Sequence, residues 1–176
     1  MTVSLVLGGA RSGKSAHAES LVAAAGGARI YLATAAAGDE EMAARIAAHR
    51  ARRGPGWRTI EEPLDIAPVI AREARTGVAI LVDCLTLWLA NLMAAGRDAE
   101  AAGTGLIGAL ADAAGTTVVV ANEVGLGIVP ENALARRFRD EAGRLNQRVA
   151  AAAADVVLMA AGLPLPLKRD GRIVHG

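Results

Sequence analysis

Aromatic side chains are scarce in this chain of 176 residues: two Trp, one Tyr and one Phe make up 2% of it, although 53% of the residues are hydrophobic. The core must therefore be filled by Ala, Val, Leu and Ile, packed closely against small side chains. The length allows one compact domain with a real core and is too short for two ordinary domains. We expect a single domain over residues 1–176.

Cysteine is nearly absent too. Cys84 is the only one, so no internal disulfide can form, and one Cys with His17, His49 and His175 cannot assemble a metal cluster at these spacings. A cytoplasmic protein in a reducing environment is expected. Lysine occurs only at Lys14 and Lys168, which makes Lys14 conspicuous.

The net charge gives no sign of a polyanionic partner, and the apolar stretches are too short for a membrane helix. Nineteen basic and eighteen acidic residues leave a formal net charge of +1, which gives no electrostatic footprint for nucleic acid. No stretch approaches the ~20 apolar residues of a membrane helix. The first apolar run ends at Gly8, which is not the pattern of a signal peptide. We expect no nucleic-acid partner and no membrane insertion.

Short runs of Val, Leu and Ile recur along the chain, separated by lengths that suit helices. The runs are continuously apolar rather than alternating, which is typical of parallel strands covered on both faces. An α/β fold is therefore expected, with a mostly parallel sheet and helices on both faces. The expected strands are Val3–Leu7, Arg29–Ala33, Val78–Val82, Thr117–Ala121 and Val156–Met159.

Helices are expected between these strands. The stretch from Asp39 to Arg53 begins with acidic residues and ends with arginines, an order that complements the helix dipole. From Gly162 onward the chain reads as an edge strand or a loose tail, because Pro164 and Pro166 limit its pairing. The expected helices are Ser15–Ala24, Asp39–Arg53, Leu64–Arg75, Leu85–Ala95, Gly103–Ala114 and Asn132–Ala153.

The clearest motif follows the first expected strand and has the Walker A pattern G-x-x-x-x-G-K-S. A triphosphate needs several donors converging on its oxygens, and backbone N–H groups at a helix N-terminus supply them. Lys14 would reach the outer phosphates, and Ser15 would offer its hydroxyl oxygen to Mg²⁺. The residues expected to bind the nucleotide here are Gly8, Gly9, Ala10, Arg11, Ser12, Gly13, Lys14 and Ser15.

An acidic residue after a second apolar strand is the usual companion of this loop. Asp83 follows the strand Val78–Val82 and is a candidate to serve the metal or the nucleotide. An Asp at a strand end is also commonly a turn residue or a helix N-cap. Both interpretations remain open from the spacing.

Two further segments carry candidate chemistry. His49 lies among Arg45, Arg52 and Arg53 on one face of an expected helix, an arrangement suited to attack on phosphorus or to a plain basic surface. The loop from Asn122 to Pro130 follows a strand at the edge where ligands bind in this architecture. It is equally well explained as a glycine-rich turn.

Taken together, these motifs resemble the bifunctional adenosylcobinamide kinase/adenosylcobinamide-phosphate guanylyltransferase family of cobalamin biosynthesis. The resemblance covers nearly the whole chain, and the order of its blocks is more specific than the Walker loop. The blocks are Gly8–Ser15, Tyr31–Ala35, Glu41–Ile46 with His49 and Arg50, Trp57–Thr59 with Glu61, Asp83–Trp88 with Asn91, Asn122–Pro130, and Ala135–Asp140 running to Asn146 and Gln147.

The resemblance implies two reactions. ATP or GTP would phosphorylate adenosylcobinamide, and GMP from GTP would then be transferred to adenosylcobinamide phosphate through a GMP-histidine intermediate, giving adenosylcobinamide-GDP and pyrophosphate. His49 matches the histidine of the intermediate. The family also implies a RecA-like P-loop sheet, Mg²⁺ and a homotrimer.

Further nucleotide contacts are implied by the same resemblance. The assignment of Glu61 and Asp83 to base, ribose or metal stays open at this stage. The positions that match are Thr34, Ala35, Ala36, Arg50, Ala51, Arg52, Arg53, Glu61 and Asp83, with Ser15 and Asp83 as metal candidates.

Two other functions compete with this interpretation. A monofunctional small-molecule P-loop kinase would use the Walker loop and leave His49 without a chemical role. A nucleotide-binding regulatory module would bind without catalysis.

Overall fold

A single sheet of eight strands organises the computed structural model, which describes residues 2–35 and 54–174. The strand order is β3-β2-β4-β5-β1-β6-β7-β8. Pairing from β3 to β6 is parallel, and β7 and β8 add an antiparallel end. The strands are β1 Thr2–Gly8, β2 Ala28–Ala33, β3 Trp57–Glu61, β4 Val78–Asp83, β5 Thr116–Asn122, β6 Asp155–Ala160, β7 Leu163–Arg169 and β8 Arg172–Ile173.

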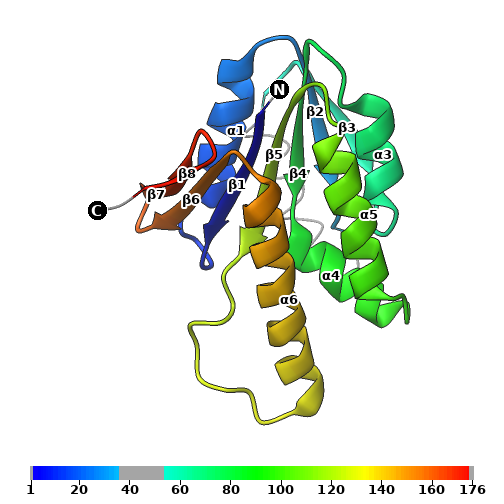
Figure 1. Cartoon of the computed structure of the whole chain (residues 1–176), viewed down its shortest axis with the longest axis vertical. Helices are drawn as coiled ribbons and strands as arrows, with labels where there is room; N and C mark the ends of the chain where they lie inside the picture. Colours follow the sequence, from blue (N-terminus) through cyan, green and yellow to red (C-terminus); the bar gives the residue numbers. More distant parts are fainter. Residues whose placement is uncertain (1, 36–53, 175–176) are drawn as a thin grey trace.

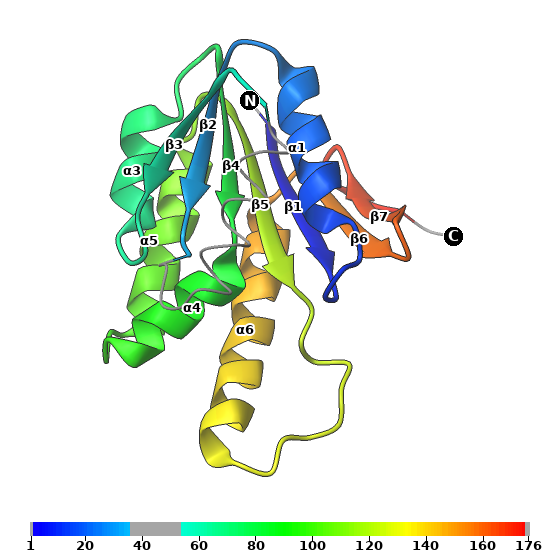
Figure 2. The ribbon, with the colours of Figure 1, turned by 180° about the vertical axis from the view of Figure 1, so that it is seen from behind.

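Helices cover both faces of the sheet. Helix α1 (Lys14–Ala25) lies on one face, and four helices lie on the other (Figures 1 and 2). These four are α3 Ile66–Glu73, α4 Leu85–Ala94, α5 Ala99–Ala111 and α6 Ala133–Ala152. The predicted α/β fold, a mostly parallel P-loop sheet between two helical layers, is confirmed. In the described ranges, no helix combines the length and apolarity needed to cross a bilayer.

Two separate cores result from the alternation of side chains along the strands. Val6, Leu81 and Val120 point to the α1 face, and Leu5 and Val82 point to the layer of four helices. All five are fully buried. Since central strands are buried on both faces, their sequences read as continuous apolar runs, as predicted.

The five predicted strands are confirmed to within one residue at each end. Helix α5 begins at Ala99 instead of the predicted Gly103, because the side chain of Asp98 accepts hydrogen bonds from the backbone N–H groups of Glu100 and Ala101. Strand β3 was not predicted; it lies at the sheet edge and carries polar residues. The predicted helix Asp39–Arg53 lies outside the described residues.

The segment after Gly162 is an ordered hairpin rather than a loose tail. Strand β7 pairs with β6 along one edge, and on its other edge β8 pairs with Lys168 and Arg169 alone among the described residues. Pro164 and Pro166 therefore lie in a part of β7 that has no described strand on its outer edge, where a missing N–H is tolerated. The Lys168 ammonium donates to the carbonyl oxygens of Ala150, Ala151 and Ala153 at 3.1, 3.1 and 2.6 Å. These carbonyls end α6, where a cation is favourable.

Two glycines should respond oppositely to alanine. A Cβ at Gly115 would lie 2.3 Å from the carbonyl oxygen of Val78 and 2.6 Å from that of Arg75, whereas at the exposed helical Gly108 it would meet nothing within 4 Å. We expect Gly115→Ala to lower the free energy of unfolding by about 1–3 kcal/mol. Gly108→Ala should raise it by about 0.5–1 kcal/mol, because alanine favours helix. Urea denaturation measures both, and equal effects would contradict the close approach.

Candidate functional site

The phosphate loop joins β1 to α1 and depends on two close backbone approaches. A Cβ at Gly8 would lie 2.8 Å from the carbonyl oxygen of Met159, and at Gly13, where φ is +93°, it would lie 3.3 Å from Gly162 Cα. The N–H of Gly162 donates to the carbonyl oxygen of Ser12 at 3.0 Å, which fixes the loop against the start of the C-terminal hairpin. The glycines of the Walker pattern are therefore needed sterically.

Positive potential gathers where this loop opens into α1. Gly13 is the N-cap, and the first turn of α1 carries no acidic side chain. The Lys14 ammonium donates to the carbonyl oxygen of Gly9 at 3.0 Å, and Lys14 and Ser15 are partly exposed. Ser12 is 8% exposed, and its Oγ has no hydrogen-bond partner among the described atoms. The loop thus offers backbone donors, a hydroxyl and a cation to an anion.

Asp83 ends β4 on the same face of the sheet as α1. Ala79 and Leu81 belong to the α1-side core, and alternation along the strand puts Asp83 on that side too. Its Oδ2 accepts a hydrogen bond from Tyr31 Oη at 2.8 Å. Burial raises the pKa of the neighbouring Cys84 thiol, the charge of Asp83 raises it further, and the charge of Lys14 opposes the rise. Lys14 and Asp83 are thus both within electrostatic reach of Cys84.

The end of β2 is fastened to the end of β4. The fully buried Thr34 hydroxyl donates to the carbonyl oxygen of Cys84 and accepts from its N–H, both at 2.8 Å. The Asn91 side-chain amide donates to the carbonyl oxygens of Thr34 at 2.8 Å and Pro63 at 3.1 Å. The Thr34 hydroxyl therefore serves the backbone of Cys84, and a direct contact of Thr34 or Ala35 with nucleotide remains a prediction.

Three of the predicted site positions meet at one edge of the sheet. In the strand register, Ala33 is the partner of Glu61 on one side and of Asp83 on the other. Glu61 and Asp83 therefore flank the end of β2, next to Thr34. The predicted residues Ala36, His49, Arg50, Ala51, Arg52 and Arg53 lie outside the described residues.

Strand β5 brings Asn122, the first residue of the predicted loop Asn122–Pro130, to the phosphate loop. Asn122 pairs with Gly8, and the N–H of Glu123 donates to the Gly8 carbonyl oxygen at 3.2 Å. The buried Oδ1 of Asn122 has no hydrogen-bond partner in the described structure. The Asn122–Glu123 pair was visible in the sequence, but its contact with Gly8 depends on β5 lying between β1 and β4.

The loop after Glu123 projects with the first turns of α6 beyond the sheet edge (Figures 1 and 2). Its apolar side chains are exposed: Leu126 is 87% and Ile128 97% exposed, and Leu134 at the start of α6 is 67% exposed. Arg136 braces the loop, donating from Nη1 to the Pro130 carbonyl oxygen at 3.0 Å. Isolated exposed apolar residues are ordinary, but here several occur on one projection.

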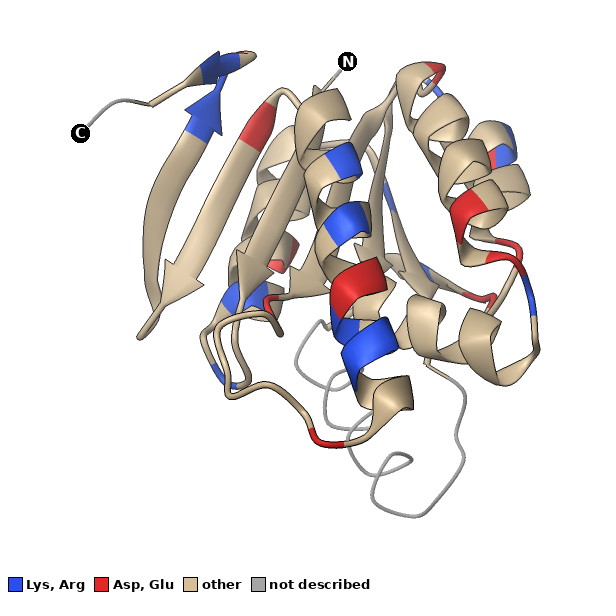
Figure 3. Ribbon diagram, turned by 60° about the horizontal axis from the view of Figure 1, so that its bottom comes forward, with Lys and Arg blue, Asp and Glu red and all other residues tan. Residues whose placement is uncertain are grey.

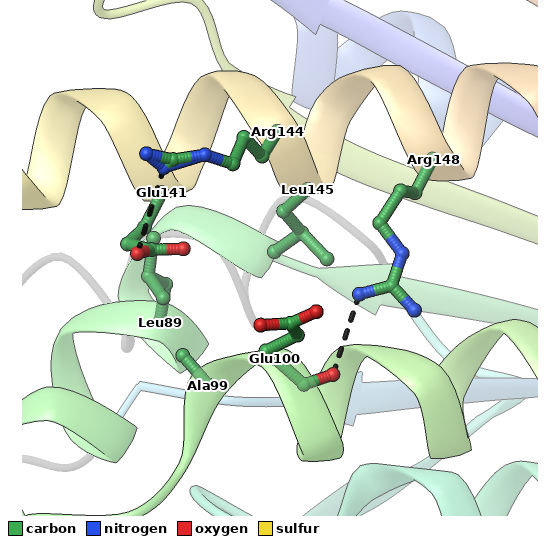
Figure 4. A pocket seen from close by; sticks show the side chains of 7 residues that line it. All are labelled: Leu89, Ala99, Glu100, Glu141, Arg144, Leu145 and Arg148. Carbon is green, nitrogen blue, oxygen red and sulfur yellow. Dashed lines mark hydrogen bonds and ion pairs between the residues drawn. The ribbon is translucent and has the colours of Figure 1, made fainter.

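Charged side chains also line a cavity of about 360 Å³ among α4, α5 and α6 (Figure 4). Arg148 Nη1 donates to the Glu100 carbonyl oxygen at 3.3 Å, and Arg144 lies 3.8 Å from Glu141. Along α6, two adjacent acidic residues lie between arginines on both sides (Figure 3). The two guanidiniums and two carboxylates balance, so this cavity has no net charge to attract a phosphate, and it contains none of the predicted nucleotide residues.

Comparison with known proteins gives one consistent family. The model of the family described as cobinamide kinase / cobinamide phosphate guanyltransferase matches residues 4–167. The bifunctional adenosylcobalamin biosynthesis protein CobP of Pseudomonas aeruginosa is 51% identical over 168 residues, covering 94% of this chain and 97% of that protein. The proteins named CobU of Salmonella typhimurium and Escherichia coli are 42% and 40% identical, each over 93% of this chain and 98% of its own length.

A search of solved structures gives a distant match. It is a prototypical ATPase from the type III secretion system of pathogenic bacteria, with 11% identity and a TM-score of 0.48, covering 89% of this chain and 50% of that chain.

The Thr34 hydroxyl should contribute more to the free energy of unfolding than the equally buried hydroxyl of Thr117. Thr34 and Thr117 are both 0% exposed, but only Thr34 has partners, whereas Thr117 Oγ1 has none among the described atoms. Thr34→Val should cost about 1–3 kcal/mol of unfolding free energy, because it leaves the buried N–H of Cys84 without a partner, whereas the Cys84 carbonyl oxygen keeps the N–H of Trp88. Thr117→Val should be neutral or stabilising by up to about 1 kcal/mol. Denaturant titration compares them, and similar losses would refute the assigned role of Thr34.

Proposed function

The chain belongs to the cobinamide kinase / cobinamide phosphate guanyltransferase family, and we propose that it catalyses both reactions in assembling the nucleotide loop of adenosylcobalamin. It phosphorylates adenosylcobinamide with ATP or GTP, then transfers GMP from GTP to adenosylcobinamide phosphate. The products of the second step are adenosylcobinamide-GDP and pyrophosphate. The whole chain, residues 1–176, acts as one P-loop catalytic domain.

One observation carries this proposal: the phosphate loop and Asp83 lie on the same face at the same edge of the sheet. The loop offers the N–H groups of the α1 N-terminus, the Lys14 ammonium and the Ser15 hydroxyl. Lys14 changes partner from the Gly9 carbonyl oxygen to the outer phosphates when nucleotide binds. In the first reaction, the substrate hydroxyl attacks the γ-phosphorus and loses its proton to water, and the bond from that phosphorus to the β,γ-bridging oxygen breaks to release ADP or GDP. These donors neutralise the charge on the transferred group.

The second reaction uses His49, which lies outside the described residues. A neutral imidazole nitrogen attacks the α-phosphorus of GTP, an N–P bond forms, and the bond from that phosphorus to the bridging oxygen breaks to release pyrophosphate. A phosphate oxygen of adenosylcobinamide phosphate then attacks the same phosphorus, and the N–P bond breaks. Arg50, Arg52 and Arg53 balance the phosphoryl oxygens. The family match supports this assignment.

The residues present suit a magnesium ion held mainly by the nucleotide. No group of three or more His, Cys, Asp or Glu side chains within residues 2–35 and 54–174 is arranged to hold a metal alone. Mg²⁺ is commonly bound through one or two protein oxygens together with substrate phosphates and water. Ser15 and Asp83 supply that donor set. When bound, the ion neutralises charge on the departing phosphate oxygens.

The remaining contacts follow from position. Glu61 and Asp83 flank the end of β2, and Glu61 serves the base or ribose of the nucleotide. Thr34 and Ala35 follow the end of β2 at the same edge. Together with Ala36, they contact the nucleotide through their backbone, and Arg50, Ala51, Arg52 and Arg53 complete the guanosine site. The family match supports these positions as a set.

The active form is proposed to be a homotrimer in the cytoplasm. Exposed apolar side chains occur on the loop after β5 and on the C-terminal hairpin, where Leu163 is 71% and Ile173 69% exposed. Burial of such surfaces between subunits would remove them from water. A single cysteine is compatible with a reducing compartment.

The division of labour between Lys14 and His49 can be tested with labelled nucleotide. With α-labelled GTP, the wild-type chain should take up an acid-labile, base-stable label. His49→Ala should lose the label and guanylyl transfer, on the order of 10³-fold or more, because it removes the nucleophile. The same variant should keep phosphorylating adenosylcobinamide.

Three results would contradict the proposal. Wild-type chain without a covalent label would exclude the histidine intermediate and favour a monofunctional kinase. Equal loss of both activities in His49→Ala would show that the division of roles is wrong. Absence of any turnover of adenosylcobinamide with GTP and Mg²⁺ would favour a non-catalytic nucleotide-binding module.

The trimer predicts a particle mass of about three times the 17.9 kDa of one chain in light scattering after size-exclusion chromatography. Ile128→Asp should shift the distribution to smaller species, since it puts a charge on the exposed loop. Arg97→Ser, at another exposed position, is the control and should leave the mass unchanged. A wild-type chain that runs as a monomer would overturn the trimer.

A further inference from the structure

We infer that Tyr31 is a positioning residue for Asp83. The Tyr31 hydroxyl donates to one carboxylate oxygen at 2.8 Å, fixes the carboxylate in one orientation, and leaves the second oxygen for the metal ion or one of its water ligands. The inference rests on the proposed function, because it takes Asp83 as a contributor to the Mg²⁺ site.

The strand register makes this contact a fixed feature of the sheet. Tyr31 is the β2 partner of Leu81, and Ala33 is the partner of Asp83. Tyr31 therefore lies one side-chain step before Asp83 on the neighbouring strand and on the same, α1-facing side. A side chain as long as tyrosine spans such a diagonal, whereas a shorter hydroxyl would not.

The ring of Tyr31 is held from its other side. Trp57 on β3 meets it edge to face, with the ring centroids 6.4 Å apart and the planes at 78°. Tyr31 is 7% exposed. A row of side chains thus crosses three strands, from Trp57 through Tyr31 to Asp83. Because the ring cannot turn freely, its hydroxyl defines where the Asp83 carboxylate lies before any ligand arrives.

The second oxygen of the carboxylate is the one left for function. Asp83 Oδ2 accepts from Tyr31, and Oδ1 receives no hydrogen bond from any described residue. A carboxylate held in advance loses less rotational freedom when it meets a metal–nucleotide complex, so removal of the hydroxyl should weaken the metal-dependent part of binding alone.

The test compares GTP binding with and without Mg²⁺. In Tyr31→Phe, which keeps the ring against Trp57, affinity in EDTA should equal that of wild type, while the gain in affinity on adding Mg²⁺ should fall about five- to tenfold, as expected for the net contribution of one ordinary hydrogen bond. The Mg²⁺ concentration for half-maximal kinase rate should rise, and the rate at saturating Mg²⁺ should approach that of wild type. Thr117→Val, which removes a buried hydroxyl on the opposite face, is the matched control and should change none of these.

A double-mutant cycle with Asp83→Asn separates positioning from general stability. Asp83→Asn should lose most of the Mg²⁺-dependent gain, and adding Tyr31→Phe should lower it no further. An unchanged gain in Tyr31→Phe, or an additional loss in the double variant, overturns the inference. If Asp83→Asn keeps the full increase in GTP affinity on adding Mg²⁺, both the proposed metal role of Asp83 and the inference about Tyr31 are wrong. Failure of the wild-type chain to turn over adenosylcobinamide would instead overturn the proposed function.

Discussion

The parallel hydrogen bonding of β1, β5, β4 and β2 is the constraint on which the site depends. Parallel strands end at the same edge, and register decides which residues meet there: Gly8 beside Asn122, and Asp83 beside Ala33. Side-chain alternation then sends Asp83 to the face that carries α1. A slip of one residue would turn it into the opposite core. A glycine-rich loop between a strand and a helix can offer N–H donors to an anion by itself. The strand register adds the carboxylate of Asp83 on the same face of the sheet.

Much of this could be predicted from the sequence because its signals are local. Continuous apolar runs gave the five parallel strands, and the spacing of Gly8, Gly13, Lys14 and Ser15 gave the phosphate loop. The early start of α5 was missed although Asp98 is an ordinary N-cap residue, because the alanines that follow it show no apolar period. Strand β3 was missed because an edge strand lacks the continuous apolar pattern of its buried neighbours.

Contacts between distant residues could not be predicted in the same way. Tyr31 and Asp83 are 52 positions apart, and Thr34 and Cys84 are 50 apart. Nothing near Tyr31 in the sequence shows whether its ring only fills the core or its hydroxyl also donates a hydrogen bond to a carboxylate. Only the pairing of β2 with β4 brings them together. His49 is the reverse case, because its role comes from the family match, and the described residues add no geometry to it.

Lys168 shows how the C-terminal hairpin contributes to a distant part of the molecule. Its ammonium donates hydrogen bonds to the last carbonyl oxygens of α6. At the start of the hairpin, the N–H of Gly162 donates to the carbonyl oxygen of Ser12 in the phosphate loop. The other end of α6 carries the projecting loop that follows β5. A shortened chain ending before Gly162 would therefore lose more than an edge strand: helix α6 would lose the cation at its C-terminus, and the phosphate loop would lose the hydrogen bond from Gly162. Pro164 and Pro166, which suggested a loose tail, lie in β7, and this strand belongs to a hairpin that contacts both α6 and the phosphate loop.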